Sequence, residues 1–200
     1  MKDGLYHSFS GDTPLHGFIG RALRTRGCLL FYCTEGCAVL ECNFLEKAFR
    51  KGHMAVIFPD TLFSIKRTGR GFKARLFELS AVLTDETTFT ASEAFCDWLY
   101  EHPVFRVPSE RRKDMDLWLA GTDWIEAHTT GKHKEMMLRN QWHNFFIGLE
   151  AVLENRLAGR DMSANGSGRR IFNGFCKLLS ENCREHHEVN FYADRLCITR

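Results

Sequence analysis

The sequence predicts an α+β protein in which a β-rich N-terminal part is followed by helices. From residue 27 to about residue 83, short runs of strand-forming residues alternate with turn residues, which is typical of a sandwich or barrel. From residue 84 onward, the apolar residues recur with helical spacing. A stretch rich in glycine and serine, residues 158–168, has the composition of a linker and predicts a boundary before a last helical segment.

The β-rich part is expected to contain strands over residues 28–33, 37–42, 45–50, 53–58, 62–66 and 72–79. The first two are expected to pair as a hairpin, because Gly36 between them supplies the positive φ of a tight turn. In the last strand, Phe72, Ala74 and Leu76 alternate with charged residues. One face of that strand is therefore expected to be buried and the other to face water.

Helices are expected next over residues 91–100, 109–128 and 134–157, with Ser109 as the N-cap of the second. The third is the longest, and its apolar residues alternate spacings of four and three. These residues are Leu138, Trp142, Phe145, Leu149 and Val152. Such spacing lets two helices mesh, so this apolar stripe is the predicted contact between two copies of the chain. The alternative is that the stripe packs on the β-rich part and on residues 109–128.

After the linker, residues 169–184 are expected to form a helix with an apolar face that includes Phe175. Asn190 is the predicted N-cap of a further helix. Val189, Ala193 and Leu196 are expected to pack against the apolar face and so to set the angle between the two helices.

Two segments together resemble the AraC-type (AraC/XylS) transcription regulators. Residues 191–199 (FYADRLCIT), preceded by the helix around Phe175, are similar to the entry into the first helix-turn-helix of that family. Residues 51–59 (KGHMAVIFP) are similar to a segment of cupin barrels in which a glycine turn leads into a strand that a proline ends. One family motif is absent, because Arg200 stands where the family often has proline.

The resemblance implies four parts. Residues 1–90 would form a cupin-like sensor barrel, or double-stranded β-helix, and residues 91–158 a helical dimerisation segment. Residues 159–168 would be the linker, and residues 169–200 the start of a helix-turn-helix domain. The recognition helix is absent from this chain, so operator DNA is expected to be bound only by the full-length protein. The implied function is that of the sensing and dimerisation portion, which works as a homodimer and responds to a small effector.

Aromatic residues of the strand region are the candidate lining of an effector pocket in the barrel mouth. They are Phe31, Tyr32, His53, Phe58, Phe63 and Phe77. The alternative for each is that it fills the barrel as part of the core. Sugars, aromatic compounds, lipids and peptides all stay open as effectors, and so does a degenerate sensor that binds no effector.

Two rival functions fit a similar architecture, a metal-dependent cupin enzyme and a cyclic-nucleotide-type sensor regulator. The enzyme would need several histidines and a carboxylate on adjacent strands, whereas only His53 stands in the strand region. The nucleotide sensor would need an arginine and exposed amides around a phosphate, and residues 69–71 (GRG) are the nearest candidate. The sequence therefore predicts neither an enzyme nor a cofactor.

Zinc is not predicted either, because structural zinc sites favour closely paired ligands. The first candidate set, Cys33, Cys37 and Cys42, is spread over both arms of the expected hairpin. The second set, Cys183, His186 and His187, does fall on one helical face, but histidines are favoured in a last helical turn in any case by the exposed carbonyls there. Most of the eight cysteines are expected to be small, reduced core residues, since the chain starts without a secretion signal and shows no membrane-spanning run. The expected location is the cytoplasm. A net charge of +2, from 27 basic and 25 acidic residues, excludes a strong overall attraction to nucleic acid.

Overall fold

The structure, a computed structural model, describes residues 6–13, 15–23, 27–59, 61–157, 171, 175, 178, 179, 182, 183 and 185–198. Contacts within the chain divide it into two compact units, Met1–Ala158 and Gly159–Arg200. The predicted linker, residues 159–168, lies outside the described residues. Each unit is described by itself.

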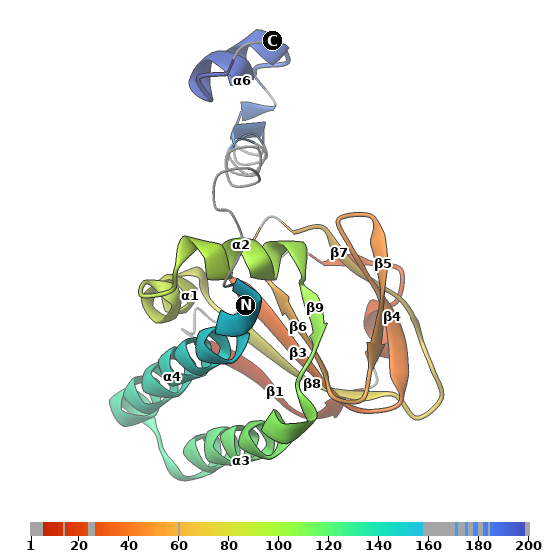
Figure 1. The fold of residues 1–200 in the computed structure, drawn as a ribbon, viewed down its shortest axis with the longest axis vertical. Coiled ribbons are helices and arrows are strands. Elements are labelled where there is room, and N and C mark those ends of the chain that lie inside the picture. Colours follow the sequence, from red (N-terminus) through yellow and green to blue (C-terminus); the bar gives the residue numbers. More distant parts are fainter. Residues whose placement is uncertain are drawn as a thin grey trace. The chain divides into compact units, whose positions relative to one another are not determined.

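The first unit contains two antiparallel sheets and a set of helices (Figure 1). The first sheet has the order β1-β8-β3-β6-β9, and the second has the order β2-β7-β4-β5. The bounds are β1 Tyr6–Thr13, β2 Ala22–Leu23, β3 Cys28–Glu35, β4 Cys37–Cys42, β5 Leu45–Arg50, β6 His53–Ile57, β7 Phe63–Thr68, β8 Lys73–Leu79 and β9 Val104–Arg106. An α+β fold is confirmed, with the strands arranged as two sheets.

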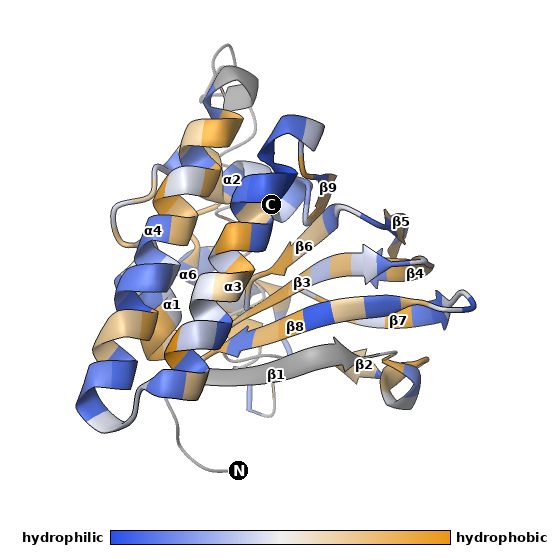
Figure 2. Cartoon of the chain, turned by 90° about the horizontal axis from the view of Figure 1, so that it is seen from below, coloured by the Kyte–Doolittle hydropathy of each residue, from blue (hydrophilic) through white to orange (hydrophobic). Residues whose placement is uncertain are grey.

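The helices cover the face of the first sheet that points away from the second sheet (Figure 1). They are α1 Ala81–Thr88, α2 Glu93–Glu101, α3 Arg112–His128 and α4 Gly131–Leu157. Seen from below, β6 is hydrophobic along nearly its whole length, as expected of a strand between two layers (Figure 2). None of the helices among the described residues has the length and apolar character needed to span a bilayer.

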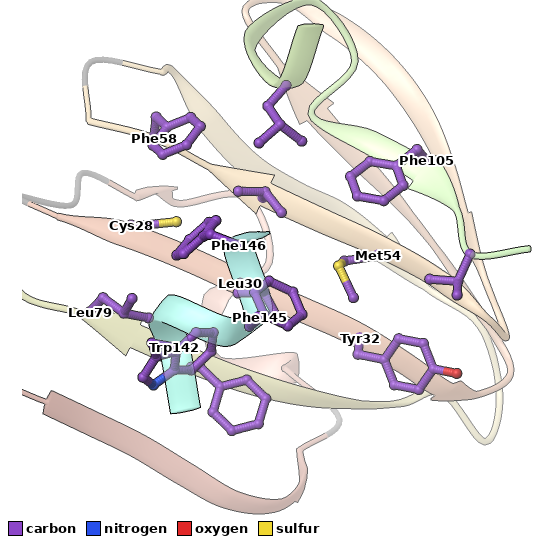
Figure 3. Packing of buried hydrophobic residues seen from close by; sticks show 14 of the residues in the cluster. Cys28, Leu30, Tyr32, Met54, Phe58, Leu79, Phe105, Trp142, Phe145 and Phe146 are labelled. Carbon is purple, nitrogen blue, oxygen red and sulfur yellow. The ribbon is translucent and has the colours of Figure 1, made fainter. Parts of the chain in front are cut away.

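Strand β3 is buried on both faces. Leu29 and Phe31 belong to the core between the sheets, whereas Leu30 and Tyr32 belong to the core beneath the helices. The second core is closed by Trp142 and other aromatic side chains of α4 (Figure 3). Because neighbouring residues of a strand point to opposite faces, this one strand contributes side chains to both cores.

The predicted hairpin between residues 28–33 and 37–42 is wrong. Strand β3 pairs with β6 and β8 in the first sheet, whereas β4 pairs with β5 and β7 in the second. Gly36 has the predicted positive φ of 68°. A Cβ atom at Gly36 would lie 2.8 Å from the Cα of Phe72, so the absent side chain lets the chain cross between the sheets beside β8.

The expectation of a water-facing side for β8 is also wrong. Ala74 and Leu76 face the second sheet, as predicted, but Phe77 and Leu79 on the other face are buried beneath the helices. On that same face, Arg75 lies against α3 and is only partly exposed. A strand that carries helices on its outer face is buried on both sides, which simple alternation does not reveal.

Several elements were not predicted, namely α1, β1, β2 and β9. Helix α1 is short and begins at Ser80, whose hydroxyl accepts a hydrogen bond from the Leu83 amide at 3.2 Å. The predicted N-cap of the next long helix is wrong, because Ser109 lies in a 3-10 turn and its hydroxyl donates to Glu110. The turn covers residues 109–111, so α3 begins at Arg112, three residues later than predicted.

In the second unit, α6 spans Val189–Arg195, so Asn190 lies inside the helix and is not its N-cap. Val189 is 73% exposed and does not pack as predicted. Tyr192 is buried instead, with its ring 5.5 Å from that of Phe175 and its hydroxyl donating to the His186 carbonyl at 2.6 Å. Ala193 is buried as well and Leu196 is half-buried, so only Val189 of the three predicted residues is exposed.

A bidentate ion pair joins α3 to strand β8 of the first sheet. Arg75 donates to both carboxylate oxygens of Asp123, at 3.0 and 2.5 Å, and its side chain is 13% exposed. A second pair on α3 joins Arg111 to Asp114 at 3.2 Å, but these side chains are 56% and 60% exposed. Burial and bidentate geometry make the first pair the more stabilising of the two.

We therefore expect Asp123→Asn to lower the free energy of unfolding by about 1–3 kcal/mol, because it leaves the Arg75 charge poorly paired. The matched control is Asp114→Asn on the same helix, for which we expect a change below about 0.5 kcal/mol. Urea denaturation monitored by circular dichroism measures both values. Equal losses in the two variants would contradict the role given to the Arg75–Asp123 pair.

Candidate functional site

The residues predicted to line an effector pocket do not surround one cavity. Phe31 and Phe63 pack on each other between the two sheets, with ring centroids 5.2 Å apart. Tyr32, Phe58 and Phe77 lie on the other side of the first sheet, in the core beneath the helices. The six positions therefore divide between two cores, as the core-filling alternative expects for most of them.

His53, the remaining residue of that set, is half-buried at the start of β6. Its Nδ1 lies 3.1 Å from the carbonyl oxygen of Ala48. Burial is the main cause that lowers the pKa of His53, and the positive charges of Arg106, Arg50 and Arg112 act in the same direction. In the part of the chain that the structure describes, no three His, Cys, Asp or Glu side chains gather to hold a metal ion.

Residues 69–71, the candidate phosphate loop, form the turn between β7 and β8. The Gly69 amide donates to the Cys37 carbonyl at 2.7 Å, and the Phe72 amide donates to the Gly69 carbonyl at 3.2 Å. The first bond joins the turn to the start of β4 and the second closes the turn itself, so both amides already have acceptors. The arrangement is that of a tight turn with a positive φ of 70° at Gly71.

The structure contains a pocket of about 250 Å³ between the first sheet and helices α3 and α4, which we call the helix–sheet pocket. Met54 of β6 and Phe105 of β9 supply residues from the sheet. Met115 and Trp118 line it from α3. From α4 come Phe145, Gly148, Leu149, Val152 and Leu153. A concave, largely apolar lining of this kind is typical of small-molecule sites.

Polar groups stand among this lining as well. Arg111 and Asp114, which form the exposed ion pair on α3, and Asn144 of α4 contribute to it. Since Arg111 and Asp114 neutralise each other, they provide hydrogen-bonding groups without a strong net charge. The pocket is therefore suited to an apolar molecule that carries one polar end.

Hydrogen bonds fix the spacing of the two helices that form the walls. The indole nitrogen of Trp118 donates to the Gln141 carbonyl at 3.2 Å, and the Gln141 amide donates to the Trp118 carbonyl at 3.1 Å. The Trp118 ring also lies 4.8 Å from that of Phe145 and 4.7 Å from that of Trp142. Trp118 therefore contacts both the pocket and the core that supports it.

A second cavity of about 190 Å³ lies beside the core between the sheets. Its lining includes Leu15, Phe18 and Phe31, and Glu78 is its one charged residue. Phe31 is the member of the predicted pocket set that reaches it. This cavity has fewer polar groups than the helix–sheet pocket and contacts neither α3 nor α4 through the residues that line it.

The stripe predicted to join two chains lies mainly within its own chain. Leu138, Trp142 and Phe145 are 3%, 0% and 8% exposed, so their surfaces are already covered. Leu149 and Val152 are half-buried and line the helix–sheet pocket. The alternative explanation, packing on the sheet and on α3, accounts for the buried members.

The pocket-lining residues that the sequence analysis did not single out include Met54, Phe105 and Gly148. Phe105 belongs to the unpredicted strand β9, and Met54 looks like any other core residue of a strand. Gly148 did carry a signal, because a glycine inside a long amphipathic helix often has a packing or functional reason.

No protein-family model matches the chain. No curated protein sequence matches it either. Solved structures do match it at the level of fold. An apo form of a ToxT variant from Vibrio cholerae has a TM-score of 0.51 and 8% identity, over 92% of this chain and 66% of that one.

Two further structures of Vibrio cholerae ToxT are similar at lower scores. ToxT from strain O395 has a TM-score of 0.47 and 12% identity, over 92% of this chain and 65% of that one. ToxT bound to an unsaturated fatty acid has a TM-score of 0.48 and 11% identity, over 92% and 64%. ToxT is an AraC-family regulator, and this chain spans just under two thirds of its length. At these identities the likeness concerns the fold.

The open space beside Gly148 can be tested through the stability of alanine variants. A Cβ atom there would meet nothing within 4 Å, whereas one at Gly121 of α3 would lie 3.1 Å from the amide nitrogen of Gln141. We expect Gly148→Ala to raise the free energy of unfolding by about 0.5–1 kcal/mol, because alanine favours a helix interior. Gly121→Ala should gain less or lose stability. Chemical denaturation measures both, and an equal gain at both positions would show that open space at Gly148 is not the difference.

Proposed function

We propose that this chain is the sensing and dimerisation portion of an AraC-type DNA-binding transcription regulator, in which a small apolar effector controls transcription. The helix–sheet pocket is the observation that carries the proposal, because it is concave, largely apolar and lined both by the first sheet and by the helices α3 and α4. The fold likeness to an AraC-family regulator supports the class. The proposal includes no catalytic step and places the protein in the cytoplasm.

Contact between the effector and the end of α4 is the proposed route of the signal. Leu149, Val152 and Leu153 line the pocket, and α4 ends at Leu157. The first unit ends one residue later, at Ala158. A molecule in the pocket would therefore contact the last turns of α4, the helix at the end of the first unit. A ligand that fits one position of this helix better than another shifts the balance between them.

The remaining parts of the proposal follow the family. The two sheets correspond to its cupin-like sensor, and the second unit corresponds to the entry of its helix-turn-helix domain. Packing of Tyr192 on Phe175 is the kind of contact that holds such helices at an angle. Base readout is assigned to a recognition helix of the full-length regulator, outside residues 171–198.

Binding of a medium-chain carboxylate tests the pocket. We expect decanoate and the uncharged 1-decanol, each below the concentration at which it aggregates, to change the tryptophan fluorescence of the chain, because Trp118 lines the pocket. Gly148→Leu fills the pocket and should weaken binding by about tenfold or more. Ala151→Leu adds the same side chain at an exposed position of α4 outside the lining, and should bind as the natural sequence does. Equal affinity in both variants would remove the pocket from the proposal.

The same variants test the regulatory role in cells. Loss of the full-length protein should change the transcription of a defined set of promoters. Complementation with Gly148→Leu should hold those promoters in one state, whereas Ala151→Leu should restore their regulation. Transcript sequencing measures the response. If loss of the protein changes no promoter directly, the assignment to transcription regulators is wrong, whatever the pocket binds.

A homodimer is part of the proposal, and its contact is assigned to the outer face of α4. Met136 and Ile147 are 48% and 47% exposed, and their separation of eleven residues places them on one side of the helix. Three members of the predicted stripe are buried in the core of their own chain. The proposal thus keeps the helix that the sequence analysis predicted to join two chains, but assigns the contact to its exposed face and not to the predicted apolar stripe.

We expect Ile147→Glu to yield folded monomers, because in a two-fold contact one introduced charge acts on both chains. Trp124→Glu, on the exposed face of α3, should leave the dimer intact. Phe145→Glu should unfold the chain at a cost of about 4 kcal/mol or more, because it buries a charge in the core. Light scattering with circular dichroism separates these results. A dimer that persists in Ile147→Glu would move the contact elsewhere.

A further inference from the structure

A third pocket, of about 250 Å³, lies beside the end of β3, the turn between β5 and β6, and the first turns of α3. Tyr32, Lys51, Gly52, Arg112 and Asp116 contribute to its lining. It shares no lining residue with the helix–sheet pocket. Its walls are mostly polar and include two cations, so it requires an explanation of a different kind.

Two cations and one carboxylate, that of Asp116, line this pocket, so the described residues leave it with an excess of one positive charge. Ion pairs among the described residues occupy other side chains, and neither Lys51 nor Arg112 has one. The Nε atom of Arg112 is buried and has no hydrogen-bond partner. A buried donor of a charged group that lacks an acceptor costs free energy, which an anion bound beside it would recover.

Gly52 holds the guanidinium group of Arg112 in place. A Cβ atom at Gly52 would lie 3.0 Å from the Nε and 3.1 Å from the Cζ of Arg112, so the guanidinium packs directly on the glycine backbone. That backbone is fixed, because the Gly52 amide donates to the Cys33 carbonyl at 2.9 Å and its carbonyl accepts from the Val107 amide at 3.0 Å. The arginine is thus positioned by packing against a rigid turn and not by an acidic partner.

Tyr32 adds a neutral donor to the two cations. Its residue is 6% exposed, and its hydroxyl points away from the apolar cluster (Figure 3). Burial raises the pKa of Tyr32 above its usual value, and the neighbouring Asp116 acts in the same direction, so the phenol keeps its proton. Lys51, Arg112 and Tyr32 therefore offer hydrogens to an oxyanion, and Asp116 offers an acceptor.

We propose that this pocket binds a small organic oxyanion, a carboxylate or a phosphate ester, that also carries a hydroxyl or ammonium group. Lys51, Arg112 and Tyr32 hold the oxyanion through charge-assisted and neutral hydrogen bonds. Asp116 accepts a hydrogen bond from the second group, and it disfavours simple anions that lack a donor. The site is independent of the apolar effector and of the proposed role in transcription.

Two matched pairs of compounds test the site on the whole 200-residue chain. Lactate differs from propionate, and glycerol 3-phosphate from n-propyl phosphate, by the presence of hydroxyl groups. Isothermal titration calorimetry should show that the hydroxylated member of at least one pair binds more tightly. The carboxylate pair and the phosphate pair distinguish the two sources of the oxyanion. Absence of binding by all four compounds would overturn the proposal.

Variants assign the binding to the named residues. Lys51→Gln and Arg112→Gln should each weaken the favoured compound by about tenfold or more, because each removes a charged donor. Asp116→Asn should reduce the preference for the hydroxylated member of the pair. Lys132→Gln is the matched control outside both pockets, and it should leave affinity unchanged.

The Lys51→Gln variant is expected to stay folded, because Lys51 is exposed. Its thermal unfolding midpoint should therefore equal that of the natural sequence. Binding that survives both Lys51→Gln and Arg112→Gln would overturn the proposal, because the compound would then lie elsewhere. If Arg112→Gln unfolds the chain, the result for Lys51→Gln decides alone. Unchanged affinity in folded Lys51→Gln would count against the site, and a loss would support it.

Discussion

Burial of the first sheet on both faces is the constraint on which the rest of the first unit depends. Alternate residues of β3 enter two different cores, so neither the second sheet nor the helices can be removed without exposing apolar surface. The helical layer is therefore a structural necessity and not an appendage to the sheets. The helix–sheet pocket occurs where this cover is incomplete, beside the small residue Gly148.

Helix α4 is the element through which the helical layer is held together. Arg139 forms an ion pair with Glu86 of α1 at 2.7 Å, and Glu150 accepts hydrogen bonds from Ser92 at the start of α2. Gln141 binds the backbone of α3. Each of the other helices thus has a polar link to α4, in addition to the aromatic packing beneath it. A molecule that displaces α4 acts on all of these links together.

The sequence predicted the strands and long helices well, because their periodicity is local. It failed where a tertiary contact decides the outcome. Gly36 was correctly assigned a positive φ, but nothing in residues 28–42 shows that the chain changes sheet there. Phe77 and Phe31 were placed in one pocket, although Phe77 pairs with Leu30, the neighbour of Phe31 along β3, and therefore faces the opposite core. The pocket proposed to bind an oxyanion was not predicted, because Tyr32, Lys51 and Arg112 are far apart in the sequence and meet only after folding.

The strand order of the first sheet also determines when this protein can fold. No two strands that are neighbours in that sheet follow each other in the sequence, and β1 pairs with β8 across some seventy residues of chain. Contacts of such high sequence separation slow folding, because the loop must close before the pairing stabilises it. During synthesis, the outer face of this sheet stays uncovered until α4 leaves the ribosome. The growing chain therefore exposes apolar strands for longer than a helical protein of equal length, and depends on its cell for protection from aggregation over that interval.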